Sequence, residues 1–458
     1  MNNDATLPTL AKGQAETARS EPWPAPRQAW YAVTIFALAL MVNFLDRGIV
    51  TLLVEPIKRD LHLTDLQMSV IMGFAFVCFY VIVGFPIARL VDSKSRRLIM
   101  GLGITCWSVM TGMCGLAQNF WQLFAARIGV GVGEACSGPA TFSMISDLFP
   151  PHRLPRAIAV LNFGFFGGAG IALLVGGAII GALSALPPMD VPLIGTLHGW
   201  QLSFLIASIP GLIVALLMTT VREPKRRGRM LDAAPGKAPP LKDVFGFLRL
   251  NFRTYFLLFA GLGCNTIVFF GTIVWQPTFF WRTYGWSPAK YGLIQGVIML
   301  VMSPGAALFG SWIAERFARH GREDANMRTV LLSACCYIPG TVAMALMPNP
   351  YLAIAAAAWV NFWGACNSGP YNAAFQTITP SRMRGQITAL YLFVFNVIGA
   401  GMGPTVVALF TDKLYHSDAL IGYALATNAM VFAPLILGLF WLTLKPYSRS
   451  VAAAAAWT

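Results

Sequence analysis

The sequence predicts an all-α polytopic membrane protein in which twelve transmembrane helices form two pseudo-symmetric six-helix bundles. Three observations support this fold class: the hydrophobic composition, twelve long apolar segments, and a motif that occurs once in each half of the chain. Of the 458 residues, 56% are hydrophobic and only 11% are charged. Because ordinary soluble domains contain about 25% charged residues, this composition indicates a chain that lies mostly in lipid.

Each apolar segment has about the length, roughly 20 residues, that a helix needs to cross the hydrocarbon core of a bilayer. The segments lie at about residues 29–53, 67–90, 98–118, 121–148, 156–186, 200–221, 254–281, 288–315, 328–348, 350–378, 385–412 and 418–444. The resulting domains are a tail at 1–28, a bundle at 29–221, a linker at 222–253, a bundle at 254–444 and a tail at 445–458.

The linker at residues 222–253 is the longest polar connection, and it divides the spans six and six. Its segments REPKRRGR and AAPGKAPP predict a flexible connection. The following segment, LKDVFGFLRLNFR, places Leu241, Val244 and Leu248 at helical spacing among basic residues. This pattern predicts a short helix that lies on the membrane surface.

The two halves of the chain repeat the same motif. ACSGP at residues 135–139 corresponds to ACNSGP at residues 365–370, at an offset of half the chain, so span four matches span ten. Two parallel repeats of six spans are typical of secondary transporters, whose binding site lies near the midplane at the interface between the repeats.

The basic residues predict the orientation. Most of the 33 Lys and Arg residues lie on the side of the N-terminus, the linker and the C-terminus. The positive-inside rule therefore predicts that both termini are cytoplasmic. The same bias accounts for the net charge of +14 through orientation and contact with membrane lipids, so we expect no nucleic-acid partner.

Span four carries two charges, Arg127 and Glu134, within an otherwise apolar run. Each such charge costs about 2.5–3.5 kcal/mol at the centre of a membrane helix, so both are expected to face protein or a water-filled cavity. Their spacing of seven residues places them on one helix face, about 10 Å apart. Gly129, Gly131 and Gly133 lie between them and would let a neighbouring helix approach closely.

Span one carries a second charged pair, Asp46 and Arg47. Counting from the outer span ends places Asp46 and Arg127 at similar depth, so we expect them to meet, with Glu134 deeper and facing the cavity. Ionisable residues inside a membrane are candidates for a functional site. The alternative is a static ion-pair cluster that only holds span one against span four.

The second half of the chain has no charge at the matching positions, because Gly364 corresponds to Glu134. We expect neutral side chains to supply its polar contacts to the cavity, chiefly Asn265, Thr266, Asn367 and Tyr371. One wall of the cavity would then be charged and the other apolar with scattered polar groups. Such a cavity suits an amphipathic substrate better than a sugar.

The loop after span two, GFPIARLVDSKSRR, contains Asp92, Arg96 and Arg97. These residues are expected to form a cytoplasmic gate by attaching the loop to a neighbouring helix end in one conformation; the alternative is ordinary positive-inside charge. The segment resembles the loop signature of the major facilitator superfamily, with Ala88 and Ser95 where that signature has glycines.

Within that superfamily, NFLDR at residues 43–47, RIGVGVGEA at 127–135 and DLF at 147–149 resemble the spinster branch. The resemblance implies transport of lysophospholipids or sphingosine phosphate and, in a bacterial inner membrane, coupling to protons. It further implies that Asp46 and Glu134 carry the protons, while Arg47 and Arg127 make coupling or headgroup contacts.

The residues leave open whether the proton and the substrate move together or in exchange for each other. Burial favours the neutral form of a carboxyl group, whereas a nearby arginine favours the ionised form. An anionic headgroup that engaged the arginines would favour protonation and give co-transport, whereas a headgroup amine that paired with Glu134 would compete with the proton and give exchange. A lateral opening between spans five and eight, or two and eleven, would favour a lipid substrate.

The energy source is expected to be a proton gradient. The sequence contains no Walker motif and no nucleophile–base set, so we expect neither ATP hydrolysis nor an enzyme, and no cofactor or metal. The runner-up is a proton-coupled carrier of small organic anions or multidrug-type amphiphiles. A monomer is expected for this fold.

Overall fold

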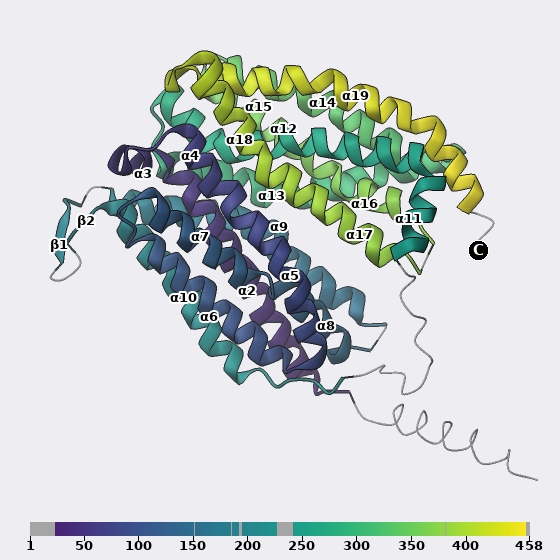
Figure 1. Ribbon diagram of the computed structural model, residues 1–458, viewed down its shortest axis with the longest axis horizontal. Helices are drawn as coiled ribbons and strands as arrows, with labels where there is room; N and C mark the ends of the chain where they lie inside the picture. The colour runs from purple at the N-terminus through teal and green to yellow at the C-terminus, as the bar shows by residue number, and fades with distance from the viewer. Residues whose placement is uncertain are drawn as a thin grey trace, which may run out of the picture.

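The computed structural model describes residues 23–150, 152–184, 186–191, 195–226, 241–380 and 382–454. The described chain is helical apart from one small β-hairpin (Figure 1). Within these residues, nine helices are long and apolar enough to cross a membrane. Helix α9 (Leu154–Leu183) and two interrupted helices, at residues 120–148 and 350–377, form the other three spans, so the predicted twelve-helix fold is confirmed. The predicted tail at 1–22 and the linker core at 227–240 lie outside the described residues.

The N-terminal bundle contains spans one to six. Its elements are α2 (Pro26–Leu52), α3 (Val54–Leu61), α4 (Asp65–Ser69), the π-helix η1 (Val70–Phe74), α5 (Ala75–Ser93), α6 (Arg96–Cys114), α7 (Phe120–Glu134), α8 (Ser137–Leu148), α9 (Leu154–Leu183) and α10 (Gly199–Thr220). The strands β1 (Met189–Val191) and β2 (Gly195–Leu197) pair antiparallel between α9 and α10.

The C-terminal bundle contains spans seven to twelve, preceded by α11 (Leu241–Leu250) where the linker sequence predicts a short helix. Its elements are α12 (Phe252–Tyr284), α13 (Pro288–Arg319), α14 (Ala325–Leu346), α15 (Pro350–Cys366), α16 (Ser368–Thr377), α17 (Arg384–Phe393), the π-helix η2 (Val394–Met402), α18 (Gly403–Leu409), the π-helix η3 (Phe410–Tyr415), the 3₁₀-helix η4 (Asp418–Leu420) and α19 (Ile421–Ala454).

The predicted C-terminal tail at residues 445–458 needs correction. Helix α19 continues to Ala454 instead of ending near residue 444. Its last turns are held by packing, since Tyr447 is fully buried. The apolar pattern that predicts span twelve stops at Lys445, but the buried Tyr447 and the following alanines carry the helix past the apolar segment.

Spans four and ten are interrupted at the repeated motif. Helix α7 ends at Glu134 and α8 starts at Ser137, while α15 ends at Cys366 and α16 starts at Ser368. A proline lacks a backbone N–H and is tolerated in the first turn of a helix. Each interruption places the proline of its motif in the first turn of the second segment, and the one in span four leaves Glu134 at the end of α7.

The two bundles meet along spans five and eight through glycines. A Cβ atom on Gly296 of α13 would lie only 2.7 Å from the carbonyl oxygen of Gly170 of α9. Nearer the hairpin, a Cβ atom on Gly177 would lie 3.0 Å from the carbonyl oxygen of Pro288. Small residues at these positions permit backbone contact between the bundles, as is usual between helices in lipid.

Spans two and eleven form the second contact between the bundles, and their π-helices η1 and η2 face each other. A Cβ atom on Gly73 would lie 2.6 Å from the carbonyl oxygen of Ala400. We call the end that carries β1, β2 and α3 the hairpin end, and the end that carries α11 and the end of α19 the linker end. The ribbons of the two bundles meet at the hairpin end and diverge toward the linker end (Figure 1).

Candidate functional site

The charged residues of spans one and four form one group, which we call the charged cluster: Asp46 and Arg47 of α2, and Arg127 and Glu134 of α7. Arg47 donates two hydrogen bonds to Oε2 of Glu134, from Nε at 2.9 Å and from Nη2 at 2.5 Å. The Glu134 side chain is fully buried, whereas the Arg47 side chain is 33% exposed. This ion pair therefore joins a hidden carboxylate to an accessible guanidinium group.

Asp46 and Arg127 approach each other differently from the sequence prediction. Nη1 of Arg127 donates to the backbone carbonyl oxygen of Asp46 at 3.4 Å, not to its carboxyl group. Both carboxyl oxygens of Asp46 are buried without a hydrogen bond in the described part of the chain. The charges of Arg127 and Arg47 act on the Asp46 carboxyl group from nearby.

Two aromatic rings of α5 flank the accessible arginine. The guanidinium carbon of Arg47 lies 4.3 Å from the ring centre of Phe76 and 5.6 Å from that of Tyr80. Such contacts hold an arginine by cation–π attraction. Sequence reasoning missed these two residues, although their spacing of four places them on the same face of one helix. The surroundings of Arg47 thus combine a positive charge with apolar surface.

The glycines between Arg127 and Glu134 differ in what surrounds them. A Cβ atom on Gly133 would lie 2.6 Å from the backbone nitrogen of Trp107 and 2.9 Å from the carbonyl oxygen of Gly103. A Cβ atom on Gly129 would meet only the flexible side chain of Met110, at 2.6 Å from its Sδ. Backbone cannot move aside as a methionine side chain can.

Gly133→Ala is therefore expected to destabilise the protein more than Gly129→Ala does. An added methyl group at Gly133 would force α7 away from α6, and overpacking of this kind typically costs about 1–3 kcal/mol. Thermal unfolding of the two detergent-purified variants measures the difference. Equal melting temperatures for the two variants would contradict the close backbone contact.

The neutral side chains expected to line a cavity from the second half need correction. Asn265, Thr266 and Tyr371 are almost fully buried and bond within the C-terminal bundle. Asn265 Oδ1 accepts from the Tyr337 hydroxyl at 2.9 Å, and the Thr266 hydroxyl donates to the Leu262 carbonyl of its own helix. The Tyr371 hydroxyl donates to the carbonyl oxygen of Leu258 at 2.5 Å. These three residues serve helix packing.

Asn367 differs from the other three because it lies at the interruption between α15 and α16. Its Oδ1 is buried without a hydrogen-bond partner among the described residues. Asn367 lies at the interruption of span ten, which corresponds to the interruption that follows Glu134 in span four.

Of the loop residues predicted as a gate, Arg96 forms ion pairs with Asp147 and Glu223 at the linker end of the N-terminal bundle. We call these three residues the clamp. Arg96 is 1% exposed and its Nη1 pairs with Oδ2 of Asp147 at the end of α8. The Arg96 backbone N–H donates to Glu223 Oε1 at 2.8 Å. Arg97 is exposed and its guanidinium group points to the carbonyl oxygens at the end of α10. The side chain of Asp92 lies outside the described set.

The clamp predicts a loss of stability in acid. Burial raises the pKa of Glu223, but hydrogen bonds from the Ser95 hydroxyl and the Arg96 N–H, together with the Arg96 charge, outweigh it and hold the pKa below its ordinary value of 4.5. A carboxyl group with a lowered folded-state pKa stabilises the fold above its unfolded-state pKa. This stabilisation is lost as pH falls from about 4.5 through the lower folded-state value.

The measurement is thermal unfolding of the wild type and of Glu223→Gln from neutral pH to below pH 4.5. The variant is expected to lose part of the acid-dependent decrease in melting temperature. Glu315→Gln is the control, because Glu315 is 65% exposed and forms only a surface pair with Arg319. A Glu223→Gln profile parallel to that of the wild type would contradict the role of the clamp.

A second ion network joins the bundles at the hairpin end. We call it the hairpin-end network, and it consists of Glu55, Lys58, Asp65, Arg282 and Asp418. Arg282 of the C-terminal bundle contacts both Asp65 oxygens at 2.7 Å and Glu55 at 2.6 Å. Lys58 contacts Asp65 at 2.8 Å and also pairs with Asp418. Asp65 is fully buried, so its own pairs with Arg282 and Lys58 are shielded from water, whereas Asp418 is 54% exposed.

Sequence reasoning missed the hairpin-end network because its members come from four separate segments. The available signal was a charge at the edge of a span: Asp65 just before span two and Arg282 at the end of span seven. Neither position alone indicates a partner. The network closes the hairpin end by linking α3 and α4 to α12 and η4.

The sequence is similar to those of known membrane transporters. Residues 36–404 match the sequence model of the Major Facilitator Superfamily. The chain is 28% identical over 432 residues to an MFS-type efflux pump of Mycolicibacterium smegmatis, covering 93% of this chain and 95% of the relative. It is 26% identical to a hexuronate transporter of Bacillus subtilis, covering 87% of this chain and 91% of the relative.

The fold is also similar to a solved structure. A bacterial homologue of the human lysosomal transporter Spinster, crystallised in an inward-facing and unoccupied conformation, superposes with a TM-score of 0.75. The two sequences are 24% identical, and the alignment covers 94% of this chain and 99% of the other. At this identity the similarity establishes a shared fold.

Proposed function

The chain belongs to the major facilitator superfamily, and on this basis we propose that it is a proton-coupled secondary transporter of an amphipathic lipid. The substrate would be a lysophospholipid or a sphingosine-phosphate-like molecule, moved by alternating access. The single observation that carries this proposal is the state of Arg47: a partly exposed cation, flanked by aromatic rings and paired with a buried carboxylate.

Arg47 matches the part of such a lipid where the phosphate meets the apolar body. Arginine binds phosphate oxygens through charge-assisted hydrogen bonds. Phe76 and Tyr80 offer apolar surface beside the guanidinium group for the first carbons of the chain. Arg127 is almost fully buried and donates a hydrogen bond to the backbone carbonyl of Asp46, so it positions α2. It contributes a positive charge to the electrostatic potential of the site but does not contact the substrate.

The same contacts suggest how a proton is coupled. A phosphate that engaged Arg47 would draw the guanidinium group away from Glu134. Arg47 is the cation that donates to Glu134 among the described residues. A buried carboxylate that loses such a donor is costly, so Glu134 would take up a proton. Among the described residues none donates a hydrogen bond to the carboxyl oxygens of Asp46, which suits a protonated carboxyl group there. Proton and anionic substrate would favour each other, as co-transport requires.

We further propose that the linker end is cytoplasmic, as the basic residues indicate. The hairpin-end network then closes the outer side. In this proposal the substrate reaches Arg47 from the linker end. For transport, the hairpin-end network must break and the linker end must close. The glycine contacts along α9 and α13 are where the bundles would rock against each other.

The runner-up is a proton-coupled carrier of small organic anions or of multidrug-type amphiphiles. It is favoured by the names of two relatives that align over most of the chain, an efflux pump and a hexuronate transporter. A hexuronate would engage Arg47 through its carboxylate but would leave the aromatic side of the site without an apolar partner.

Equilibrium binding to protein in nanodiscs distinguishes the two proposals. Fluorescent lysophosphatidylglycerol is expected to bind saturably, and Arg47→Gln is expected to weaken binding at least about tenfold, the effect of losing roughly 1.4 kcal/mol. Arg59→Gln is the control, because Arg59 is 86% exposed at the hairpin end. Displacement of the label by a hexuronate but not by unlabelled lysolipid would favour the runner-up and contradict the lipid proposal.

A further inference from the structure

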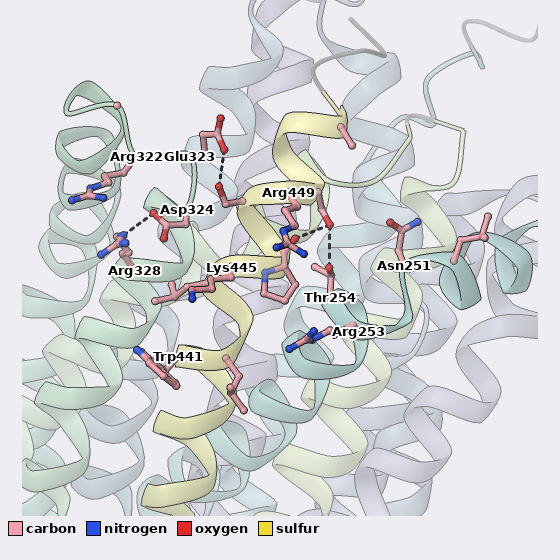
Figure 2. Close-up of a pocket in the computed structure, with 18 residues that line it drawn as sticks. Asn251, Arg253, Thr254, Arg322, Glu323, Asp324, Arg328, Trp441, Lys445 and Arg449 are labelled. Atoms are coloured by element: carbon pink, nitrogen blue, oxygen red, sulfur yellow. Dashed lines mark hydrogen bonds and ion pairs between the residues drawn. The ribbon is translucent and has the colours of Figure 1, made fainter.

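A cavity lies away from the charged cluster, at the linker end of the C-terminal bundle. It has a volume of about 950 Å³ and is lined by the start of α12, the turn between α13 and α14, and the end of α19. Figure 2 shows Arg253, Lys445 and Arg449 gathered around the end of α19, with Trp441 one turn before Lys445. The charged cluster lies in the other bundle, so the function proposed above does not use this cavity.

The cavity carries an excess of positive charge that the described residues do not neutralise. Five basic and two acidic side chains line it. Arg328 pairs with Asp324 at 2.6 Å, which leaves four basic residues, Arg253, Arg322, Lys445 and Arg449, without a carboxylate partner in the described part of the chain. These residues come from three separate segments that converge only in the folded bundle.

The second acidic residue, Glu323, forms a hydrogen bond with a hydroxyl group and no ion pair with the described cations. Its Oε2 accepts a hydrogen bond from the Ser448 hydroxyl at 2.6 Å. Thr254 and Ser450 hydroxyls, 3.0 Å apart, add polar groups to the wall. Cations together with hydroxyl groups form the kind of lining that binds phosphate oxygens.

One side of the same cavity is apolar and exposed. Trp441 is 65% exposed, Leu442 is 45% exposed and Leu250 is 88% exposed. Exposed apolar side chains continue along α19 away from the cavity, at Leu435 and Met430. Tryptophan at the end of a span is typical of the membrane–water interface. A free phosphate would use only the charged wall, whereas a membrane lipid would use both sides.

We propose that this cavity binds the phosphate headgroup of an anionic membrane phospholipid from the leaflet at the linker end. The headgroup lies among Arg253, Lys445 and Arg449, and the acyl chains lie along the exposed side of α19. The lipid is a resident ligand and not cargo. By bridging the start of α12 and the end of α19, it holds the linker end of the C-terminal bundle together.

Native mass spectrometry of the detergent-purified protein tests this site directly. The probes are dioleoylphosphatidylglycerol, the zwitterionic dioleoylphosphatidylcholine and inorganic phosphate. The wild type is expected to retain one phosphatidylglycerol in preference to phosphatidylcholine, and Arg253→Gln/Arg449→Gln is expected to reduce that retention at least tenfold. Arg153→Gln/Arg156→Gln is the control, since it removes the same charge from exposed positions at the same end of the other bundle.

The thermal stability of the same samples provides the second measurement. Phosphatidylglycerol is expected to raise the melting temperature of the wild type and of the control variant but not that of the cavity variant. Equal retention by all three proteins would overturn the proposal. Stabilisation by inorganic phosphate alone, with no preference for phosphatidylglycerol, would assign the cavity to a soluble phosphate and would equally overturn it.

Discussion

Glu134→Gln is expected to abolish the response of transport to a pH gradient while the protein stays folded. Glutamine has the shape of glutamate, and its side-chain oxygen can still accept from Arg47, but it cannot bind and release a proton at neutral pH. We expect uptake driven by an imposed pH gradient to fall at least tenfold, to the level without a gradient. Proteoliposomes that contain equal amounts of wild type and variant allow this comparison.

The control for Glu134→Gln is Glu315→Gln, which removes an exposed carboxylate and should keep the full response. Exchange of labelled for unlabelled substrate without a gradient checks that the variant still binds and moves it. A Glu134→Gln protein whose transport responds to the gradient as the wild type does would show that Glu134 carries no coupling proton. Asp46→Asn, assayed in parallel, tests the second carboxyl group of the charged cluster.

Arg282→Gln is expected to open the hairpin end. Arg282 is 6% exposed and holds Asp65 and Glu55 across the bundle interface. Removing one member of a buried ion pair typically costs about 3–5 kcal/mol when the other charge is left unpaired. Asp65 keeps its contact with Lys58 at 2.8 Å, so we expect the cost of Arg282→Gln to be smaller. The contact exists only while the hairpin end is closed, so its loss weakens that state selectively and favours the state that is open there.

Hydrogen exchange measured by mass spectrometry detects this change without introducing labels. In Arg282→Gln we expect faster exchange in α3, α4 and η4 and, as the linker end closes, slower exchange in α8 and α16. Lys290→Gln is the control, since Lys290 contacts Trp286 at the same end within one bundle. Faster exchange at both ends would indicate general destabilisation and would contradict a selective effect on the closed hairpin end.

The spans and the repeat could be predicted because hydrophobic length and a repeated motif are properties of the chain itself. The pairing inside the charged cluster could not. Counting along the helices gives the depths of Asp46 and Arg127, but the rotation of α2 decides which arginine reaches which carboxylate. In the structure Arg47 pairs with the Glu134 carboxylate, and Arg127 donates a hydrogen bond to the backbone carbonyl of Asp46.

Polar residues within spans were the least predictable. Asn265 and Tyr371 look from sequence like cavity contacts, but each finds a partner on a neighbouring helix, because a buried polar group without a hydrogen bond is costly in lipid. The clamp and the hairpin-end network join residues far apart in sequence, such as Arg96 with Glu223 and Asp65 with Arg282. Only the packing of the helices reveals such pairs.

We propose that this transporter uses a proton gradient to move a lysolipid. The most direct measurement is uptake of labelled lysophosphatidylglycerol into proteoliposomes, with and without an imposed pH gradient, and with empty liposomes to subtract spontaneous insertion. We predict protein-dependent uptake that the gradient accelerates and that Arg47→Gln eliminates. Intact protein that moves no lysolipid under either condition, but moves a small organic anion in the same vesicles, would contradict the claim.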